Sequence, residues 1–471
     1  MNRIVPLILA VALFMENMDS TVIATSLPAI ALDIGTSPVA LKLALTAYLV
    51  SLAIFIPVSG WMADKFGAKN VFRIAIAVFV VGSIACAMAN SLGVFVVARF
   101  FQGMGGAMMT PVARLVLVRA TPRRELVSAM AWLTIPGLIG PLVGPPVGGF
   151  ITTFMTWHWI FLINVPIGIA GILLATRFLP DVPVGGSAPL DMPGFLLSAI
   201  AASGVVFGLS VVSLPALPPI IGIATLLVGI VSGVIYLVHA RRAKFPILKL
   251  QLFKNPVFRA SVVGGAVFRI GNGAVPFLLP LMFQLGFGLS PFQSGMLTFA
   301  SAVGALAMKF LAPFTLRTGG FRTVLIASSI LASVFIAANG LFTPYTSPAI
   351  IIAVLLGAGF LRSLFFTSAN ALVFADIEDK DASQATAIAA VTQQISIALG
   401  VALAGGLLEG HAYVTGEPIG LSAFTTAFFS VAVVTAFAAL SFYRLPGDAG
   451  SEVSGHRLAE SSADEPLPPT R

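Results

Sequence analysis

Two carboxylates lie inside the first long apolar run of the chain. Glu16 and Asp19 interrupt a hydrophobic stretch that begins at Ile4, and their spacing places both side chains on one face of a helix. A charge at the centre of a bilayer costs about 2.5 to 3.5 kcal/mol on insertion scales, so acids placed there indicate a functional site. Two carboxylates one turn apart in a medium of low dielectric should not both be ionised. The pair therefore predicts a site that can hold a proton.

The other acidic residues are predicted to lie outside the membrane. Hydropathy assigns all of the 18 Asp and Glu residues except Glu16 and Asp19 to loops or to the tail, and Glu409 is among those placed in loops. If a carboxylate carries protons through the membrane, Glu16 and Asp19 are then the only candidates. The alternative is that Asp19 lies near the outer interface, while Glu16 only forms a hydrogen bond between packed helices.

Arg99 is the base best placed to pair with these acids. It lies several residues into the fourth apolar run, and Gln102 lies one helical turn further in. A lone guanidinium at this depth needs an acid, a carbonyl or water as partner, unless its side chain snorkels to the outer interface. We expect Asp19, Glu16 and Arg99 to form a proton-coupling group, in which Arg99 pairs with a carboxylate that has lost its proton.

Two further bases are predicted to lie deep in apolar runs, and they are candidates for a substrate cavity. Arg269 lies in the middle of the ninth run and Arg362 well inside the twelfth. Gln102 can bind substrate through its amide, and Phe14 and Met18 share the first helix with the acids. For Phe14 and Met18, core packing is the alternative role.

Composition predicts that the helices of a membrane protein position these residues. Of the 471 residues, 58% are hydrophobic and 9% are charged, with a mean hydropathy of +1.01, whereas soluble domains have about 25% charged residues. Apolar runs of about 20 residues, each able to cross a hydrocarbon core of about 30 Å as a helix, recur along the chain. Hydropathy predicts fourteen spans, near 4–28, 39–61, 71–89, 94–117, 126–152, 159–179, 194–212, 218–238, 258–285, 292–314, 323–342, 349–373, 385–408 and 421–443.

The bases of the predicted loops lie almost entirely on one side. The loops after even-numbered spans carry them, from Lys65 to Lys380, and the opposite loops carry none. This asymmetry predicts cytoplasmic termini. It also explains the net charge of +8 without nucleic acid as a partner, since the charges flank a lipid bilayer.

The spans are predicted to form two six-helix halves with a two-helix insertion. The sequence Gly67-Ala68-Lys69-Asn70-Val71 follows the second span and Gly320-Phe321-Arg322-Thr323-Val324 follows the tenth, which is the pattern of a duplicated half. The predicted divisions are an N-terminal bundle at 1–180, an inserted hairpin at 181–239, a basic cytoplasmic link at 240–257, a C-terminal bundle at 258–443 and a disordered tail at 444–471.

Several classes of function find no support in the sequence. Cys86 is the only cysteine and the four histidines fall at predicted span ends, in loops or in the tail, so we expect no metal site or cofactor. There is no Gly-Lys-Ser/Thr phosphate loop and no catalytic cluster, so neither ATP hydrolysis nor another enzyme activity is expected. A channel would need a continuous polar pore, which the scattered charges do not provide.

Two further stretches have the composition of conformational elements. The loop after the second span contains Gly60, Asp64, Lys65, Gly67 and Lys69. Its acid can meet a neighbouring helix end and latch one state, although a plain solvated loop is the alternative.

In the fifth span glycines recur every fourth residue, which gives a smooth face for close helix approach, and prolines bend the helix. Plain packing is the alternative here. The residues concerned are Gly140, Pro141, Gly144, Pro145, Gly148 and Gly149.

Together these stretches resemble the major facilitator superfamily. The loop Gly60–Lys69, the first-helix stretch Asp19–Pro28, the fourth-helix stretch Arg99–Ala107 and the fifth-helix stretch Gly140–Gly149 are similar to motifs of its drug:proton antiporters. Fourteen spans match the fourteen-helix branch of that group. Residues 157–164 and 268–271 resemble the MdtD-type multidrug transporters of Gram-negative bacteria. Ala68 departs from the loop motif, which usually has a base there.

The resemblance implies an exporter that exchanges protons for lipophilic, cationic drugs by alternating access in a bacterial inner (plasma) membrane. Its partners would be protons and a small-molecule substrate, and an adaptor with an outer-membrane channel could complete the route. The motif acid of the family corresponds to Asp19, whereas Glu16 is not required by the branch pattern. Export of an endogenous metabolite or siderophore, and a sensor role without transport, remain alternatives.

Overall fold

The computed structural model describes residues 4–122, 125–180, 189–378 and 381–451. These residues form helices and no strand, and fourteen of the helices are long and apolar enough to cross a membrane. The predicted all-α fold with fourteen spans is therefore confirmed. Residues 452–471 of the predicted tail and 181–188 of the predicted hairpin lie outside the described residues.

The N-terminal half contains the first six spans. Its helices α1 and α6 pack together, and α5 packs against both α3 and α4. The first span is continuous through a 3-10 turn, η1. The bounds are α1 Ile4–Val22, η1 Ile23–Ser26, α2 Leu27–Asp33, α3 Lys42–Phe66, α4 Ala68–Ala87, α5 Leu92–Ala120, α6 Leu126–Phe154, α7 Trp159–Leu162 and α8 Asn164–Phe178.

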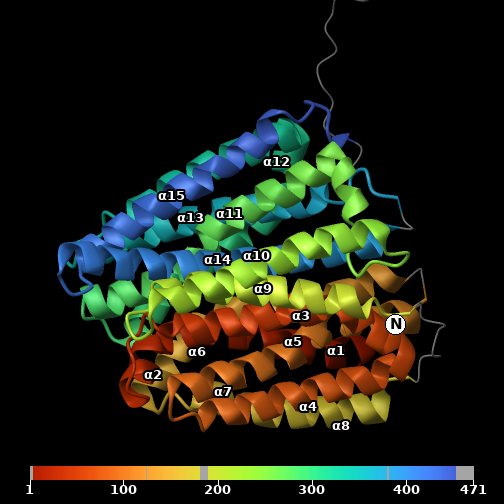
Figure 1. Cartoon of the computed structure of the whole chain (residues 1–471), viewed down its shortest axis with the longest axis horizontal. Coiled ribbons are helices and arrows are strands. Elements are labelled where there is room, and N and C mark those ends of the chain that lie inside the picture. The colour runs from red at the N-terminus through yellow and green to blue at the C-terminus, as the bar shows by residue number, and fades with distance from the viewer. Residues whose placement is uncertain (1–3, 123–124, 181–188, 379–380, 452–471) are drawn as a thin grey trace, which may run out of the picture.

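The C-terminal half contains the last six spans and lies above the N-terminal half in Figure 1. Its α12 holds two spans, and a non-helical Gly320 with φ of 65° kinks the helix between its two ends. Gly67, the predicted counterpart of Gly320, also has a positive φ of 86°, a conformation that favours glycine. The bounds are η3 Leu250–Lys254 in the link, then α11 Pro256–Leu281, η4 Met282–Gly286, α12 Pro291–Asn339, α13 Pro348–Leu372, α14 Ala382–Thr415 and α15 Leu421–Tyr443.

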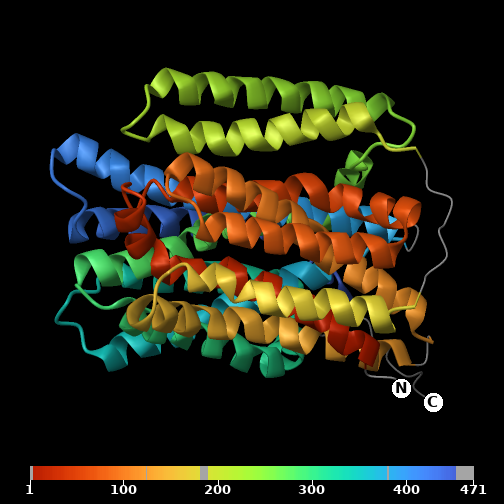
Figure 2. The same ribbon diagram turned by 90° about the horizontal axis from the view of Figure 1, so that it is seen from below.

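The inserted hairpin consists of α9 Met192–Val212 and α10 Pro219–Arg242, and it runs along one edge of the molecule (Figure 2). Gly204 and Gly229 let these two helices approach closely, since a Cβ on either would meet the other's backbone within 3 Å. Helix α9 packs against both α3 and α14. The hairpin therefore contacts both halves.

The two halves also contact each other directly. Helix α3 packs against α14 and α6 against α12. A Cβ on Gly149 would lie 2.4 Å from the carbonyl oxygen of Pro291, and a Cβ on Gly295 would lie 2.3 Å from that of Pro145. These contacts lie near the end of α6 and the beginning of α12, so small residues allow backbone contact between the halves there.

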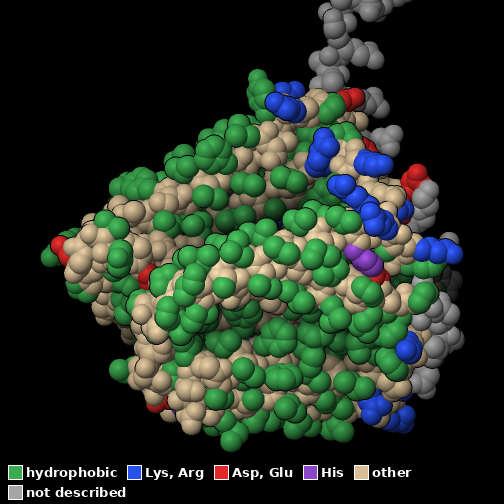
Figure 3. All heavy atoms as spheres, in the orientation of Figure 1, with side chains coloured by type: hydrophobic (Ala, Val, Ile, Leu, Met, Phe, Trp, Pro, Cys, Tyr) green, Lys and Arg blue, Asp and Glu red, His purple; other side chains and the backbone are tan. Residues whose placement is uncertain are grey.

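Lys and Arg side chains gather at one end of the molecule, and hydrophobic side chains cover the band beside them (Figure 3). We call this basic end the inner end and the opposite end the outer end. The distribution is the one expected if the inner end faces the cytoplasm; the orientation itself stays a prediction.

Candidate functional site

Asp19 and Arg99 form an ion pair inside the N-terminal half. Arg99 Nη1 donates to Asp19 Oδ2 over 2.7 Å, and the two side chains are 1% and 0% exposed. The guanidinium carbon lies 4.2 Å from the centre of the Tyr48 ring, a cation–π contact. Arg99 thus meets an acid and does not reach the outer interface.

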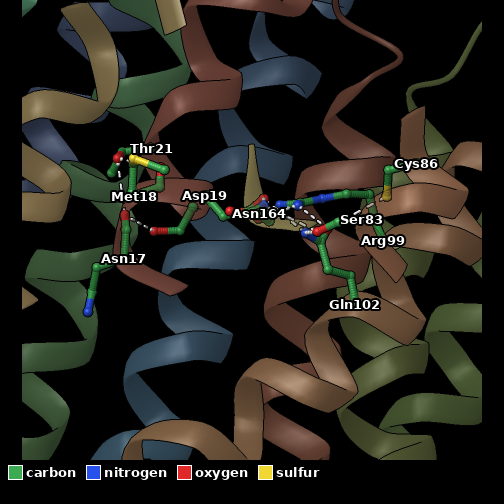
Figure 4. Close-up of polar contacts among 10 residues, drawn as sticks. Asn17, Met18, Asp19, Thr21, Ser83, Cys86, Arg99, Gln102 and Asn164 are labelled. Atoms are coloured by element: carbon green, nitrogen blue, oxygen red, sulfur yellow. Dashed lines mark hydrogen bonds and ion pairs between the residues drawn. The ribbon is translucent and has the colours of Figure 1, made fainter. Parts of the chain in front are cut away.

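Amide and hydroxyl groups complete the surroundings of the Asp19 carboxylate (Figure 4). Gln102 Nε2 and Asn164 Nδ2 donate to Asp19 Oδ1 over 2.9 and 2.8 Å. Both amides also donate to Ser83 Oγ, and Gln102 Oε1 accepts from Arg99 Nη1 over 2.6 Å. The carboxylate therefore receives three donors from α5 and α8, which stabilise its charged form.

Close helix packing brings these groups together. A Cβ on Gly82 would lie 2.6 Å from the Gln102 Cα, and a Cβ on Gly103 would lie 2.7 Å from the Tyr48 carbonyl oxygen. The glycines thus bring α4 and α3 against α5. The low dielectric of such a packed interior strengthens the ion pair but makes an unpaired charge costly.

Glu16 lies one turn toward the inner end and has simpler surroundings. It is partly exposed, and its Oε2 accepts a hydrogen bond from Thr110 Oγ1 on α5 over 2.6 Å. Gly106 of α5 lies beside it, since a Cβ there would lie 3.7 Å from the Glu16 Cγ, an ordinary contact distance. The two acids therefore differ: Asp19 is enclosed by donors, whereas Glu16 has one hydroxyl donor and remains accessible.

The prediction that Glu409 lies in a loop is wrong. Helix α14 continues to Thr415, and Glu409 is 8% exposed within it. Its Oε2 forms an ion pair with Lys42 Nζ at the beginning of α3, and Lys42 Nζ also donates to Ser213 Oγ over 2.7 Å. Hydropathy ended the span at the charge because it cannot see the distant base that compensates it.

The predicted cavity residues do not form one cluster. Gln102 belongs to the Asp19 group, and Met18 is buried in α1. Arg269 on α11 is 7% exposed and donates to Asn370 Oδ1 over 2.8 Å. Arg362 lies partly buried on α13, and Phe14 is partly exposed on α1.

The glycine face of α6 lies against α1. A Cβ on Gly140 would meet the backbone of Phe14 and Met18, one on Gly144 would lie 2.0 Å from Thr21 Oγ1, and one on Gly148 would lie 2.3 Å from the Val22 carbonyl oxygen. The neighbouring prolines at 136, 141, 145 and 146 lie inside the helix. The stripe is thus a packing surface, and any further role of it stays a prediction.

The loop motif after α3 makes one ion pair with a neighbouring helix. Asp64 Oδ1 accepts from Arg119 Nη2 in the last turn of α5 over 2.6 Å, with both side chains 32% exposed. Lys65 lies over the Trp61 ring at 4.6 Å. An added Cβ on Gly60 would meet nothing within 4 Å. The expected meeting of the acid with a helix end is present.

Sequence reasoning missed three members of the Asp19 group, namely Tyr48, Ser83 and Asn164. Asn164 carried a usable signal, because an amide within an apolar span must find hydrogen-bond partners. Ser83 carried little signal, since a serine can bond to its own helix backbone.

Known proteins resemble this chain in sequence. The sequence profile of the Major Facilitator Superfamily matches residues 9–314 and 261–467. The chain is 35% identical over 447 residues to a protein of Yersinia pestis (strain Pestoides F) named "Putative multidrug resistance protein MdtD", covering 94% of this chain and 96% of that one. A protein of the same name from Yersinia pseudotuberculosis serotype O:1b (strain IP 31758) matches equally.

Solved structures share the fold at low sequence identity. A point mutant of the nucleoside transporter NupG superposes with a TM-score of 0.69 at 16% identity, covering 93% of this chain and 100% of that one. A D-xylose-proton symporter superposes with a TM-score of 0.69 at 14% identity, covering 95% and 98%. These two likenesses concern the arrangement of helices and not the substrate.

Proposed function

Because this chain belongs to the Major Facilitator Superfamily and holds a buried Asp19–Arg99 pair beside Glu16, we propose that it is a proton-coupled exporter. It is a multi-pass membrane transporter and not an enzyme. The proposed mechanism is alternating access, in which a site between two helical halves opens to each side in turn. The proposed location is a bacterial inner membrane with both termini in the cytoplasm.

The observation that best supports proton coupling is the difference between the surroundings of Asp19 and Glu16. Asp19 is enclosed by Arg99, Gln102 and Asn164, whereas Glu16 holds one hydroxyl donor and is partly exposed. In the proposed cycle Glu16 exchanges its proton with the inner side in this conformation. Outward opening separates Asp19 from Arg99 and lets Asp19 take a proton from outside, because a carboxylate without its base is neutralised more readily. When the Asp19–Arg99 pair forms again, Asp19 loses this proton, which leaves to the inner side by way of Glu16.

The substrate proposed from the family is a lipophilic small molecule. The names of the Yersinia relatives support drug export, and an acidic site would favour a cation. Export of an endogenous metabolite or siderophore on the same scaffold is the alternative. An adaptor and an outer-membrane channel would carry the substrate onward.

The test is efflux from proteoliposomes with an imposed pH gradient and a panel of lipophilic cationic dyes. Glu16→Gln combined with Asp19→Asn should abolish pH-driven efflux, since neither amide takes up a proton. Glu417→Gln, an exposed acid after α14, is the matched control and should transport normally. Full pH-driven efflux by the double variant would disprove the coupling assignment.

A further inference from the structure

The charges of the two halves differ in how they are compensated. In the N-terminal half, Asp19 is paired with Arg99. Across the two halves, Glu409 on α14 is paired with Lys42 on α3. Helices α11, α12, α13 and α15 contain no Asp or Glu at all, yet α11 and α13 carry Arg269 and Arg362 within their spans. The C-terminal half thus holds buried positive charge without a carboxylate on the helices that carry it.

Arg269 is held in place by neutral groups. Its Nη2 donates to Asn370 Oδ1, and its guanidinium carbon lies 5.1 Å from the centre of the Phe366 ring. The side chain folds over Gly265, where an added Cβ would lie 2.6 Å from Nη1. A guanidinium has five N–H donors and a full positive charge. One amide oxygen and one aromatic ring use only some of these donors and do not neutralise the charge.

A narrow pocket with room for about one water-sized atom, such as a single carboxylate oxygen, opens beside this guanidinium, between α11, α13 and α14. Its polar lining comes from Arg269, Ser261, Asn370 and Thr392, and the rest of the wall is apolar. The Ser261 hydroxyl donates to the Ala369 carbonyl over 2.7 Å. Arg269 is therefore the cationic group that faces this space.

Arg362 lies near the same level of the membrane. Arg269 is 13 residues from the beginning of α11 and Arg362 is 10 residues from the end of α13, both counted from the inner end, which is about 20 and 15 Å at 1.5 Å per residue. Arg362 is also one turn from Phe366, whose ring contacts Arg269. The two cations thus lie at similar depth, and Phe366 contacts Arg269 and is one helical turn from Arg362.

The described acids nearest in sequence lie outside the spans. Asp376 is exposed in the loop after α13, and Asp381 accepts from Lys249 Nζ over 2.6 Å. Among the residues that the structure describes, neither Arg269 nor Arg362 has an ion-pair partner. A buried, uncompensated guanidinium is costly, and a bound anion would remove that cost.

We propose that the pocket at Arg269 binds the oxyanion of a substrate, with a carboxylate as the best fit to the guanidinium fork. This inference rests on the proposed export function and names the charge that the substrate brings to the C-terminal half. Arg362, on α13 and outside the pocket lining, adds positive potential at a similar depth.

The experiment measures equilibrium binding without any pH gradient. The purified full chain in phosphatidylcholine nanodiscs is titrated with 2-naphthoate, with the neutral 2-naphthamide and with a naphthylmethyl-trimethylammonium salt. We expect naphthoate to bind at least tenfold more tightly than naphthamide. Arg269→Gln should weaken naphthoate binding at least tenfold, and Arg269→Lys should weaken it less.

Lys309→Gln is the matched control, because Lys309 is an exposed base on α12 that donates to Thr367. It should change naphthoate binding less than twofold. Gly265→Ala tests the geometry with Arg269 retained, since the new Cβ displaces the guanidinium, and it should also weaken binding. This second variant keeps the test valid if Arg269→Gln does not fold.

Three results would overturn the inference: no naphthoate binding to the unaltered chain, equal affinity for naphthamide, or an equal loss in Lys309→Gln. Displacement of naphthoate by phosphatidylglycerol and not by soluble carboxylates would assign the pocket to a lipid phosphate and also overturn it. The Glu16→Gln/Asp19→Asn variant should still bind naphthoate. Naphthoate binding without proton-coupled transport would therefore reject the proposed function alone. Proton-coupled transport that Arg269→Gln does not change, together with no naphthoate binding, would reject this inference alone.

Discussion

Lys42 at the beginning of α3 forms a buried ion pair with Glu409 near the end of α14, which joins the two halves at their outer ends. Ser213 at the end of α9 accepts a further hydrogen bond from the same ammonium. One lysine thus links the N-terminal half, the C-terminal half and the inserted hairpin. Any motion that separates α3 from α14 at this end must break the pair.

Removing one partner of this pair should destabilise the protein strongly. Glu409→Gln leaves the Lys42 charge buried without its partner, and breaking a buried pair in this way costs about 3 to 5 kcal/mol. Replacing both partners by apolar residues, as in Lys42→Met with Glu409→Leu, removes that penalty and should recover most of the loss. Thermal unfolding of the purified proteins measures these stabilities: the double variant should melt at a higher temperature than Glu409→Gln and close to the unaltered chain. Unchanged melting of Glu409→Gln would show that the pair contributes nothing to the folded state.

Replacing Arg99 by lysine should impair transport although the charge is kept. The guanidinium donates to both Asp19 and Gln102 and lies over the Tyr48 ring. An ammonium is a compact point charge that cannot reproduce this planar arrangement. We expect pH-driven efflux to fall at least tenfold in Arg99→Lys. Arg177→Lys at the exposed end of α8 is the control, and equal efflux by both variants would contradict the prediction.

A single methyl group on the glycine face of α6 should disturb its contact with α1. In Gly144→Ala the new Cβ would lie 2.0 Å from Thr21 Oγ1 and 2.9 Å from the Thr21 Cβ. Closely packed helices cannot absorb such overlap without moving apart, which typically costs about 1 to 3 kcal/mol. Gly93→Ala on α5 meets nothing within 4 Å and should melt like the unaltered chain. Equal melting temperatures of the two variants would rule out a close-packing role for Gly144.

The sequence predicted the parts of this molecule that hydropathy and local spacing control. Fourteen spans, the glycine face of α6 and the candidacy of Asp19 and Arg99 all follow from residues close together in the chain. The partners that depend on folding did not follow. Asn164 reaches Asp19 across 145 positions and Glu409 reaches Lys42 across 367, and no local pattern reports such distances. Hydropathy ends a predicted span at a charged residue whether or not the fold supplies a partner for the charge. For this reason the sequence predicts a loop at Glu409, where the structure has a helix.

The Asp64–Arg119 pair offers a test of whether the loop after α3 acts in the transport cycle. Because both side chains are about one-third exposed, the pair should contribute at most about 1 kcal/mol to stability. Asp64→Asn should therefore leave the melting temperature nearly unchanged. If the pair latches α3 to α5 in one conformation, the same variant should slow pH-driven efflux, and exchanging the two charges in Asp64→Arg with Arg119→Asp should restore part of the rate. Normal efflux by Asp64→Asn would instead mark the loop as solvated surface, whose charges only orient the chain in the membrane.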